Sequence, residues 1–332
     1  MPTLAFLNSW QKRCFMEKKL KSYQSKNLIT GTWKAKLFYG CVIAIPVLQC
    51  TIFVFIVLLN SVFLSFKQYD YGTGEYIFKG NIFQNYKVFW STISSSGSSL
   101  GIATKNSLIL WFWTSLVGIS LALFFSFYIV KKYKGSEFFK TMLFLPTIVS
   151  TIAMSLIYRR FVDRFLSDFL EQYFGVDIGT PFYDEVKMRF VMVVLYSCLM
   201  GFGTQVLMYT GVMSRIPESL SEYASLDGIN AFQEFIHITL PLIYPTISTF
   251  LVAGIGAIFT AHGSMYDFYG PYAESTIQTV GYFLYNRTVG DGKLLAEYPL
   301  TAAYGVAFTL ITVPTTLIAR WVLDRLSPEV EY

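Results

Sequence analysis

Residues 37–66, LFYGCVIAIPVLQCTIFVFIVLLNSVFLSF, decide the class of fold to which this chain belongs. These 30 residues include no Lys, Arg, Asp, Glu or His. A helix of about 20 apolar residues is long enough to cross the hydrocarbon core of a bilayer. The internal Pro46 fits such a helix, because neighbouring groups in a membrane protein satisfy the backbone that proline frees. The stretch therefore predicts a membrane-spanning helix.

Five more apolar runs follow along the chain. Their centres carry no Lys, Arg, Asp or Glu, so a voltage sensor or a carboxylate proton relay finds no support. Only 14% of the 332 residues are charged, whereas soluble domains carry about a quarter. We therefore predict an all-α membrane protein with six transmembrane helices rather than a large soluble enzyme. The further predicted spans cover residues 107–130, 141–158, 190–213, 246–268 and 300–323.

Basic residues near the span ends predict the orientation of the chain. Residues 1–36 carry eight Lys or Arg and one acidic residue, and the loop 131–140, KKYKGSEFFK, carries four more lysines. Because such residues concentrate on the cytoplasmic side, we expect the N-terminus and, after six spans, the C-terminus in the cytoplasm. We predict a basic cytoplasmic tail over 1–36 and a transmembrane domain over 37–332, within which the loop 214–245 is cytoplasmic by parity.

The sequence offers no metal site or catalytic constellation of its own. Its four cysteines lack CxxC spacing, and its two histidines stand in no HExxH or Cys/His arrangement. A GxxxxGK[ST] phosphate loop is absent, so the chain is not expected to bind ATP in that manner. We expect no catalytic residue, no bound metal or cofactor and no nucleic-acid partner.

The loop 214–245 interrupts the apolar pattern with an amphipathic segment, EYASLDGINAFQEFIHITLP, at 222–241. Pro217 suits the first turn of a short helix, and Gly228 suits its end, where a left-handed residue is common. A second helix is expected from Asn230, whose spacing from Gln233 is that of a capping box. We therefore predict a helix–turn–helix in this loop.

The predicted helix–turn–helix has one apolar and one acidic side. Pro241 and Pro245 mark the start of the fifth span. An acidic side disfavours an inner leaflet that is itself negative, so a protein partner fits better than lipid. The apolar stripe, at helical spacing, consists of Phe232, Phe235, Ile236, Thr239 and Leu240.

This segment resembles the EAA loop of bacterial ABC importer permeases, whose pattern is Glu-Ala-Ala, three residues, Gly, nine residues and Ile-x-Leu-Pro. Tyr223 departs from the pattern and bears on how closely the helix packs against its partner. The stretch IPESLSEYASLDGINAFQEFIHITLPLIYP, 216–245, is similar to the carbohydrate branch, related to the maltose and glycerol-phosphate permease subunits. The matching positions are Glu222, Ala224, Gly228, Ile238, Leu240 and Pro241.

The resemblance extends from about residue 37 to the end of the chain. SFKQYD after the first span, FLPTIVS in the third and YGPYAEST after the fifth are similar to the family at matching places. It implies the architecture of a type I ABC importer permease in the bacterial cytoplasmic membrane. It also implies a heterodimer with a second, homologous permease subunit, two ATPase subunits that hold ATP and Mg, an external solute-binding protein and a sugar substrate.

In such importers the loop helix lies in a groove of the ATPase, and closure of the ATPase dimer on ATP drives alternating access. By this resemblance Glu222 would pair with a basic residue of the groove, and Gly228 would permit the turn. Ile238, Leu240 and Pro241 would fix the loop to the fifth span. The whole predicted coupling group is Glu222, Ala224, Asp227, Gly228, Ile238, Leu240 and Pro241.

Small and polar residues at helical spacing in two spans are candidates for the solute pathway. They are Ser197, Gly201, Thr204 and Gln205 in the fourth span, and Ala253, Gly256, Ala257, Thr260 and Ser264 in the fifth. Close helix packing through small residues explains Gly201, Ala253 and Gly256 equally well. An amide or hydroxyl in hydrocarbon needs a partner, so Gln205 and Thr260 favour the pathway. The related maltose subunit binds sugar on these same spans, and Tyr196, Tyr209 and Phe259 are candidates for stacking on sugar rings.

The absence of charge within the spans favours a neutral sugar or oligosaccharide, recognised by hydroxyl, amide and aromatic groups. Acidic sugars and glycerol phosphate stay open as alternatives. The outer segment 159–189 is amphipathic and is either a platform for the binding protein or a structured connector. A secondary transporter would need intramembrane carboxylates, and a membrane-embedded enzyme would need a His, Cys or Asp constellation at the helix ends.

Overall fold

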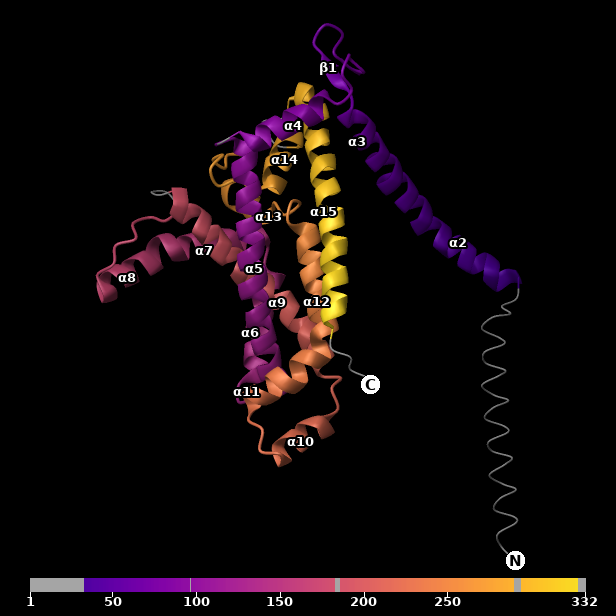
Figure 1. Cartoon of the computed structure of the whole chain (residues 1–332). Coiled ribbons are helices and arrows are strands. Elements are labelled where there is room, and N and C mark those ends of the chain that lie inside the picture. Colours follow the sequence, from indigo (N-terminus) through magenta and orange to yellow (C-terminus); the bar gives the residue numbers. More distant parts are fainter. Residues whose placement is uncertain (1–32, 96, 183–185, 290–293, 328–332) are drawn as a thin grey trace, which may run out of the picture. The chain divides into compact units, whose positions relative to one another are not determined.

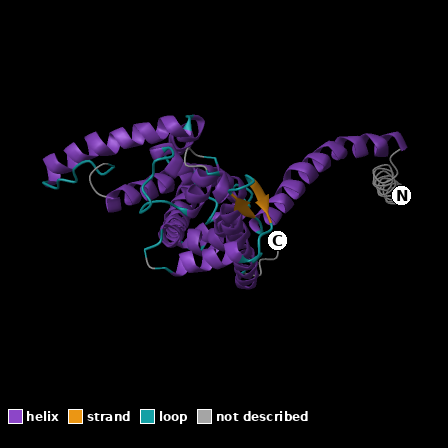
Figure 2. Cartoon of the chain, turned by 90° about the horizontal axis from the view of Figure 1, so that it is seen from above, coloured by secondary structure: helices purple, strands orange, loops and turns teal. Residues whose placement is uncertain are grey.

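The structure is a computed structural model that describes residues 33–95, 97–182, 186–289 and 294–327. These residues are mostly helical (Figure 2). The described residues divide into two units, with the boundary between Phe63 and Leu64. Most of the basic tail predicted for residues 1–36 lies outside the described residues.

The described part of the first unit is one helical rod. It consists of α2 (Trp33–Cys50), a π-helical segment η1 (Thr51–Ile56) and the beginning of α3 (Val57–Ser65). Pro46 lies inside α2, and in the following turn the Thr51 hydroxyl donates to the Val47 carbonyl oxygen at 2.8 Å. Side chains from Lys36 to Asn60 are exposed, as suits a helix surrounded by lipid. The first predicted span is confirmed, since Lys36–Ser65 is long and apolar enough to cross a membrane.

Four long helices form the body of the second unit: α5 (Ser99–Val130), α9 (Val186–Met213), α12 (Leu240–Ala257) and α15 (Tyr298–Leu326) (Figure 1). A buried bond from the Ser126 hydroxyl to the Val206 carbonyl oxygen, 3.0 Å, joins α5 to α9. The Tyr244 hydroxyl donates to the Leu323 carbonyl oxygen at 3.0 Å and joins α12 to α15. The second, fourth and sixth predicted spans are confirmed within α5, α9 and α15.

The third predicted span, 141–158, is not one continuous helix. The chain forms α6 (Ser136–Ile148) and then α7 (Thr151–Arg160), which continues through η2 (Phe161–Leu166) into α8 (Ser167–Phe174); the bend is 109°. The break falls two residues after Pro146, where Ile148, Val149 and Thr151 surround a serine. Such residues favour extended backbone or compete for backbone hydrogen bonds. The described part of the second unit thus has four helices that are long and apolar enough to cross a membrane. With the helix of the first unit this makes five, or six if the bent pair forms one span.

The fifth predicted span, 246–268, is wrong at both ends. The helix already begins at Ala231, runs through α11 (Ala231–Glu234), η3 (Phe235–Thr239) and α12, and ends at Ala257. The π-helical turn η3 ends two residues before Pro241, which has no amide N–H to donate to the preceding turn. Residues beyond Ala257 leave the helix, and a separate short helix α13 (Gly263–Tyr269) follows.

Shorter elements, among them α4 (Gln84–Ser94) and α14 (Val280–Thr288), cover one end of the helical bundle. The helices α10 and α11 lie at the opposite end (Figure 1). The described strands, β1 (Gln68–Asp70) and β2 (Glu75–Ile77), form one antiparallel hairpin. The Asn106 amide of α5 donates to the carbonyl oxygens of Thr276 and Gln278 at 2.9 and 3.0 Å. The backbone N–H of Val280 donates to the Ser107 hydroxyl at 2.9 Å. These bonds fix the segment before α14 against α5.

Gly281 lies where two backbone segments approach each other closely. A Cβ atom added at this position would lie 2.6 Å from the carbonyl oxygen of Ala261 and 2.7 Å from that of Thr260. These carbonyl groups belong to the non-helical stretch that follows α12. The Thr279 hydroxyl, two residues earlier, donates to the Ala261 carbonyl oxygen at 3.1 Å. Only a residue without a side chain allows α14 to begin against the broken fifth helix.

Candidate functional site

The loop between α9 and α12 folds as the predicted helix–turn–helix. Its first helix is α10 (Glu218–Leu226), with Pro217 at the N-cap. Gly228 adopts φ 72°, and the N–H groups of Gly228 and Ile229 donate to the carbonyl oxygens of Ser225 and Ala224 at 3.2 and 3.0 Å. This is a Schellman motif, in which two otherwise unpaired carbonyls of the helix end are satisfied. The left-handed turn predicted at Gly228 is therefore confirmed.

The second helix of the loop begins at the predicted capping box. Asn230 Oδ1 accepts from the Gln233 N–H at 2.9 Å, and Gln233 Oε1 accepts from the Asn230 N–H at 3.0 Å. Two backbone donors at the helix start are thus satisfied reciprocally. Both ends of the turn are locked by local bonds, so α10 and α11 are held at a defined angle.

The loop presents a mixed acidic and apolar surface. Glu222, Tyr223 and Asp227 are exposed, Leu226 is 81% exposed and Phe232 is 70% exposed. Ala224 is buried, whereas Ile238, Leu240 and Pro241 are half-buried. The predicted coupling residues therefore divide into an exposed group, Glu222, Asp227 and Gly228, and a covered group, Ala224, Ile238, Leu240 and Pro241.

The apolar stripe predicted on the second helix does not lie on one buried side. The rings of Phe235 and Phe127 are 5.1 Å apart, and Leu240 joins the same core cluster between α5, α9 and α12. Phe232 and Ile236 instead face outward. The stripe divides because the π-helical turn from Phe235 to Thr239 changes the helical spacing on which it was predicted.

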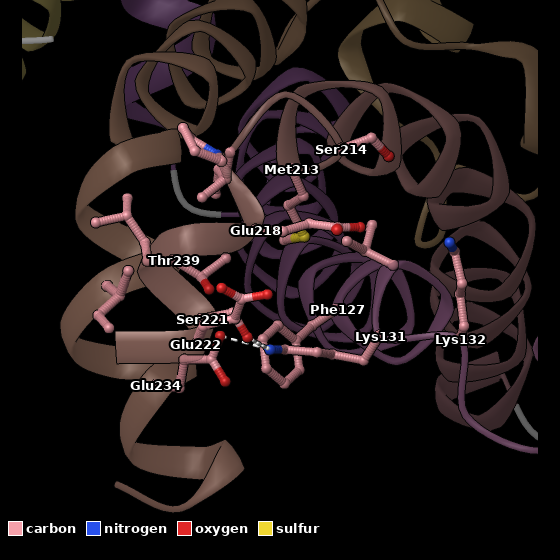
Figure 3. A pocket seen from close by; sticks show the side chains of 15 residues that line it. Phe127, Lys131, Lys132, Met213, Ser214, Glu218, Ser221, Glu222, Glu234 and Thr239 are labelled. Atoms are coloured by element: carbon pink, nitrogen blue, oxygen red, sulfur yellow. Dashed lines mark hydrogen bonds and ion pairs between the residues drawn. The ribbon is translucent and has the colours of Figure 1, made fainter. Parts of the chain in front are cut away.

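A cavity of about 430 Å³ separates α10 from the end of α5 (Figure 3). Its wall includes Glu218 and Glu222 on one side and Lys131 on the other. The ammonium group of Lys131 lies 2.5 Å from the Ser221 hydroxyl and 2.5 Å from Glu234 Oε1. The Glu234 side chain is thus turned into the molecule; no short-range pattern pairs residues 103 positions apart.

A second cavity, of about 230 Å³, lies between the long helices. It brings together most of the residues predicted for the solute pathway, and the hydroxyl oxygens of Ser197 and Ser264 are 3.1 Å apart. The predicted residues that line it are Ser197, Gly201, Gln205, Ala257 and Ser264.

Four pathway candidates do not line this cavity: Thr204, Ala253, Gly256 and Thr260. Thr204 is exposed on another face of α9. Thr260 follows the end of α12, and its hydroxyl donates to the Ala257 carbonyl oxygen at 3.2 Å. The prediction for Thr260 assumed a helix that continues to this residue, whereas α12 ends at Ala257. The aromatic candidates are also placed elsewhere, with Tyr196 and Tyr209 buried in core clusters and the Phe259 ring 4.7 Å from that of Phe308.

Helix α5 supplies the part of the cavity wall that sequence reasoning missed. The indole N–H of Trp111 and the amide oxygen Oε1 of Gln205 are buried without a hydrogen-bond partner, and both side chains line the cavity. The 15 lining residues include no Lys, Arg, Asp, Glu or His. The pattern that marks the wall, at i, i+4, i+7 and i+8, was present in the sequence as Ser107, Trp111, Thr114 and Ser115.

Membrane-length helices around a neutral polar cavity, with a structured polar loop at one end, define a polytopic membrane permease. Residues 114–332 match the family described as binding-protein-dependent transport system inner membrane component. The chain belongs to this family, and the resemblance to ABC importer permeases is confirmed. Among the described residues no group of three or more His, Cys, Asp or Glu is placed to hold a metal ion.

Relatives of known assignment are transport permeases. The chain is 27% identical over 222 residues to the arabinooligosaccharides transport system permease protein AraP of Bacillus subtilis, covering 65% of this chain and 69% of that protein. It is also 27% identical to the galactooligosaccharides transport system permease protein GanP of the same organism, of which it spans about half, 51%. A solved bacterial ABC transporter involved in import of the acidic polysaccharide alginate has the same fold, with a TM-score of 0.72 at 19% identity, over 91% of this chain and 100% of that one.

Proposed function

We propose that the chain is the transmembrane subunit of an ATP-driven, binding-protein-dependent importer of a saccharide in a bacterial cytoplasmic membrane. In this proposal residues 37–332 form the permease domain and residues 1–36 a cytoplasmic tail. Both termini and the loop 214–245 face the cytoplasm. Family membership and the sugar specificity in the names of two relatives support this assignment.

The loop couples the permease to a partner ATPase. The observation that carries this is the doubly locked turn at Gly228, which presents Glu222, Tyr223 and Leu226 outward on a helix of fixed direction. A carboxylate beside large apolar side chains suits a protein groove with a basic residue better than an anionic leaflet. ATP and Mg belong to the two ATPase subunits, and the permease binds neither.

A second, similar permease subunit completes the pathway. The cavity of about 230 Å³ is smaller than the roughly 300–1,000 Å³ typical of small-molecule sites, so one chain supplies part of a site. An external solute-binding protein delivers the substrate, in keeping with the family description. A solved relative of the same fold, at 18% identity, was determined in complex with an alginate pentasaccharide-bound periplasmic protein.

The cavity suits a neutral, hydroxyl-bearing solute. Trp111 offers a donor without an acceptor, and Gln205 offers an acceptor without a donor. A sugar hydroxyl both accepts and donates, so it satisfies both groups, whereas a carboxylate only accepts. The uncharged wall also provides no cation to compensate an acidic sugar. We therefore place arabino- or galacto-type oligosaccharides ahead of acidic ones as substrates.

Gln205→Met is expected to leave the melting temperature of the complex unchanged or raised, because it removes a buried amide that has no partner in the chain. The same change is expected to lower saccharide uptake by roughly tenfold, the equivalent of about one hydrogen bond to the substrate. Thr204→Val, one residue earlier but outside the cavity, is the matched control and should keep uptake. Unchanged uptake in Gln205→Met would remove this residue from the pathway.

The decisive experiment measures ATP hydrolysis by the co-purified complex in proteoliposomes. Loaded binding protein is added with arabino-, galacto- or alginate oligosaccharides as probes. We expect stimulation by a neutral saccharide, and loss of that stimulation in Glu222→Lys. Glu137→Lys makes the same charge change at another exposed acid, outside the coupling loop, and should be stimulated normally. Absence of any associated ATPase would refute the importer; stimulation by alginate oligosaccharides alone would refute the neutral substrate.

A further inference from the structure

The side chain of Lys131 joins three segments that are far apart in the sequence. Lys131 is the C-cap of α5, Ser221 lies on α10 and Glu234 is the last residue of α11. The ammonium group reaches both partners at 2.5 Å (Figure 3). One charged group therefore holds both helices of the loop against the end of α5.

This ion pair is shielded from solvent. The side chain of Lys131 is 22% exposed and that of Glu234 is 13% exposed. The Lys131 ammonium lies 5.6 Å from the centre of the Phe127 ring, and this ring packs against Phe235. Ion pairs with direct hydrogen bonds are strengthened where water is partly excluded, so this contact is more persistent than a surface ion pair.

Helix α5 connects this contact to the solute cavity. Ser107, Trp111 and Ser115 line that cavity, and Lys131 follows at the C-terminal end of the same uninterrupted helix. The 16 residues from Ser115 to Lys131 correspond to about 24 Å along the axis at about 1.5 Å per residue. A regular helix of this length moves as a unit, so displacement at one end is felt at the other.

We propose that Lys131 is a positioning residue that makes the loop and α5 move together during transport. Through it, movement of α10 and α11 reaches the cavity wall on α5 as well as the directly attached helix α12. This inference rests on the proposed function, because the movement is supplied by the partner ATPase. The role needs a charged pair with Glu234 and not merely a long side chain.

The neighbouring Lys132 provides a matched control. It is exposed, and no ion-pair partner is found for it among the described residues. Figure 3 shows its side chain directed away from the cluster of Lys131, Ser221 and Glu234. Lys131→Gln and Lys132→Gln remove the same charge one residue apart, and only the first is expected to affect coupling.

The test measures accessibility of the cavity in the assembled complex. Ser115→Cys is introduced after replacement of the native cysteines by alanine, and its rate of labelling by a cationic methanethiosulfonate reagent is followed in proteoliposomes. Mg-ATP with vanadate is the probe for the ATP-driven state, so no identified sugar is needed. Basal ATP hydrolysis is measured in parallel, because it reports that the ATPase remains docked.

We expect Mg-ATP with vanadate to change the labelling rate in the otherwise native complex and in Lys132→Gln. In Lys131→Gln and Glu234→Gln the ATP-dependent change in labelling rate should be at least about fivefold smaller, while basal ATP hydrolysis persists. About fivefold is the lower end of typical coupling between two sites. The double variant Lys131→Glu with Glu234→Lys, which exchanges the two charges, should restore the ATP-dependent change in labelling rate. If the lysine served only a structural role, the exchange would not restore this change.

A full ATP-dependent change in Lys131→Gln, or no recovery in a folded exchanged pair, would overturn the role of Lys131. If Lys131→Gln fails to assemble, Glu234→Gln and the exchanged pair decide the matter. A native complex without ATPase association, or without any change on Mg-ATP and vanadate, would instead refute the proposed function and with it this inference.

Discussion

Gly281→Ala is expected to lower the melting temperature of the permease by roughly 2–12 °C. The added methyl group would lie 2.6 Å from the Ala261 carbonyl oxygen and 2.7 Å from that of Thr260, and backbone atoms cannot rotate away as a side chain does. Overpacking of this kind costs about 1–3 kcal/mol, and about 1 kcal/mol shifts the melting temperature of a domain of this size by about 2–4 °C. Relief of the contact would also displace Thr279, whose hydroxyl is bonded to Ala261.

The measurement is thermal unfolding of the purified protein, followed by tryptophan fluorescence. Gly305→Ala is the matched control, because its added methyl would meet no atom within 4 Å inside α15. Alanine is also the better helix former, by about 1 kcal/mol, so this variant should be as stable as the native chain or more so. Equal melting temperatures for the two variants would show that the contact at Gly281 relaxes without cost.

Gly228→Val is expected to abolish stimulation of the partner ATPase while the helical bundle remains folded. Gly228 adopts φ 72°, and left-handed backbone costs a residue with a side chain about 1–2 kcal/mol, more when it is β-branched. The two Schellman bonds to Ser225 and Ala224 would be lost together. The direction of α10 relative to α11 would then no longer be fixed, and Glu222 would not reach a partner groove reliably.

The same position offers the control. Asparagine tolerates left-handed backbone better than other residues with side chains, so Gly228→Asn is expected to retain most of the stimulation. ATP hydrolysis with loaded binding protein is compared for the two variants, and circular dichroism verifies that both keep the bundle. Normal stimulation in Gly228→Val would mean that the left-handed turn is unnecessary for coupling.

Features that depend on neighbours in the sequence were readable from it. The capping box of Asn230 and Gln233 joins residues three apart, and the turn at Gly228 needs only a residue that tolerates positive φ. The predicted spans are confirmed where an apolar run is uninterrupted. The third predicted span is not a continuous helix, because proline and β-branched residues lie close together near Val149. A hydropathy profile does not detect such a helix-breaking combination.

Features that depend on distant contacts were not readable. Asn106 bonds to carbonyl oxygens 170 and 172 residues away, and Lys131 pairs with a glutamate 103 residues away. Nothing in the local pattern around Glu234 separates it from the exposed Glu222. The cavity was predicted on two of its helices, since small and polar residues recur there, but Trp111 reads as an ordinary interfacial aromatic until its indole N–H is found buried without an acceptor.

The helix is continuous from Ala231 to Ala257, so its number of residues fixes how the loop is rotated about the helix axis relative to the cavity. Its 27 residues correspond to about 40 Å, with Ile238 and Leu240 near one end and the cavity residue Ala257 at the other. One inserted or deleted residue would turn everything beyond it by about 100° and shift it by about 1.5 Å. The number of residues in this segment is therefore fixed by rotation about the helix axis as much as by length, unlike that in the irregular residues 175–182 that follow α8.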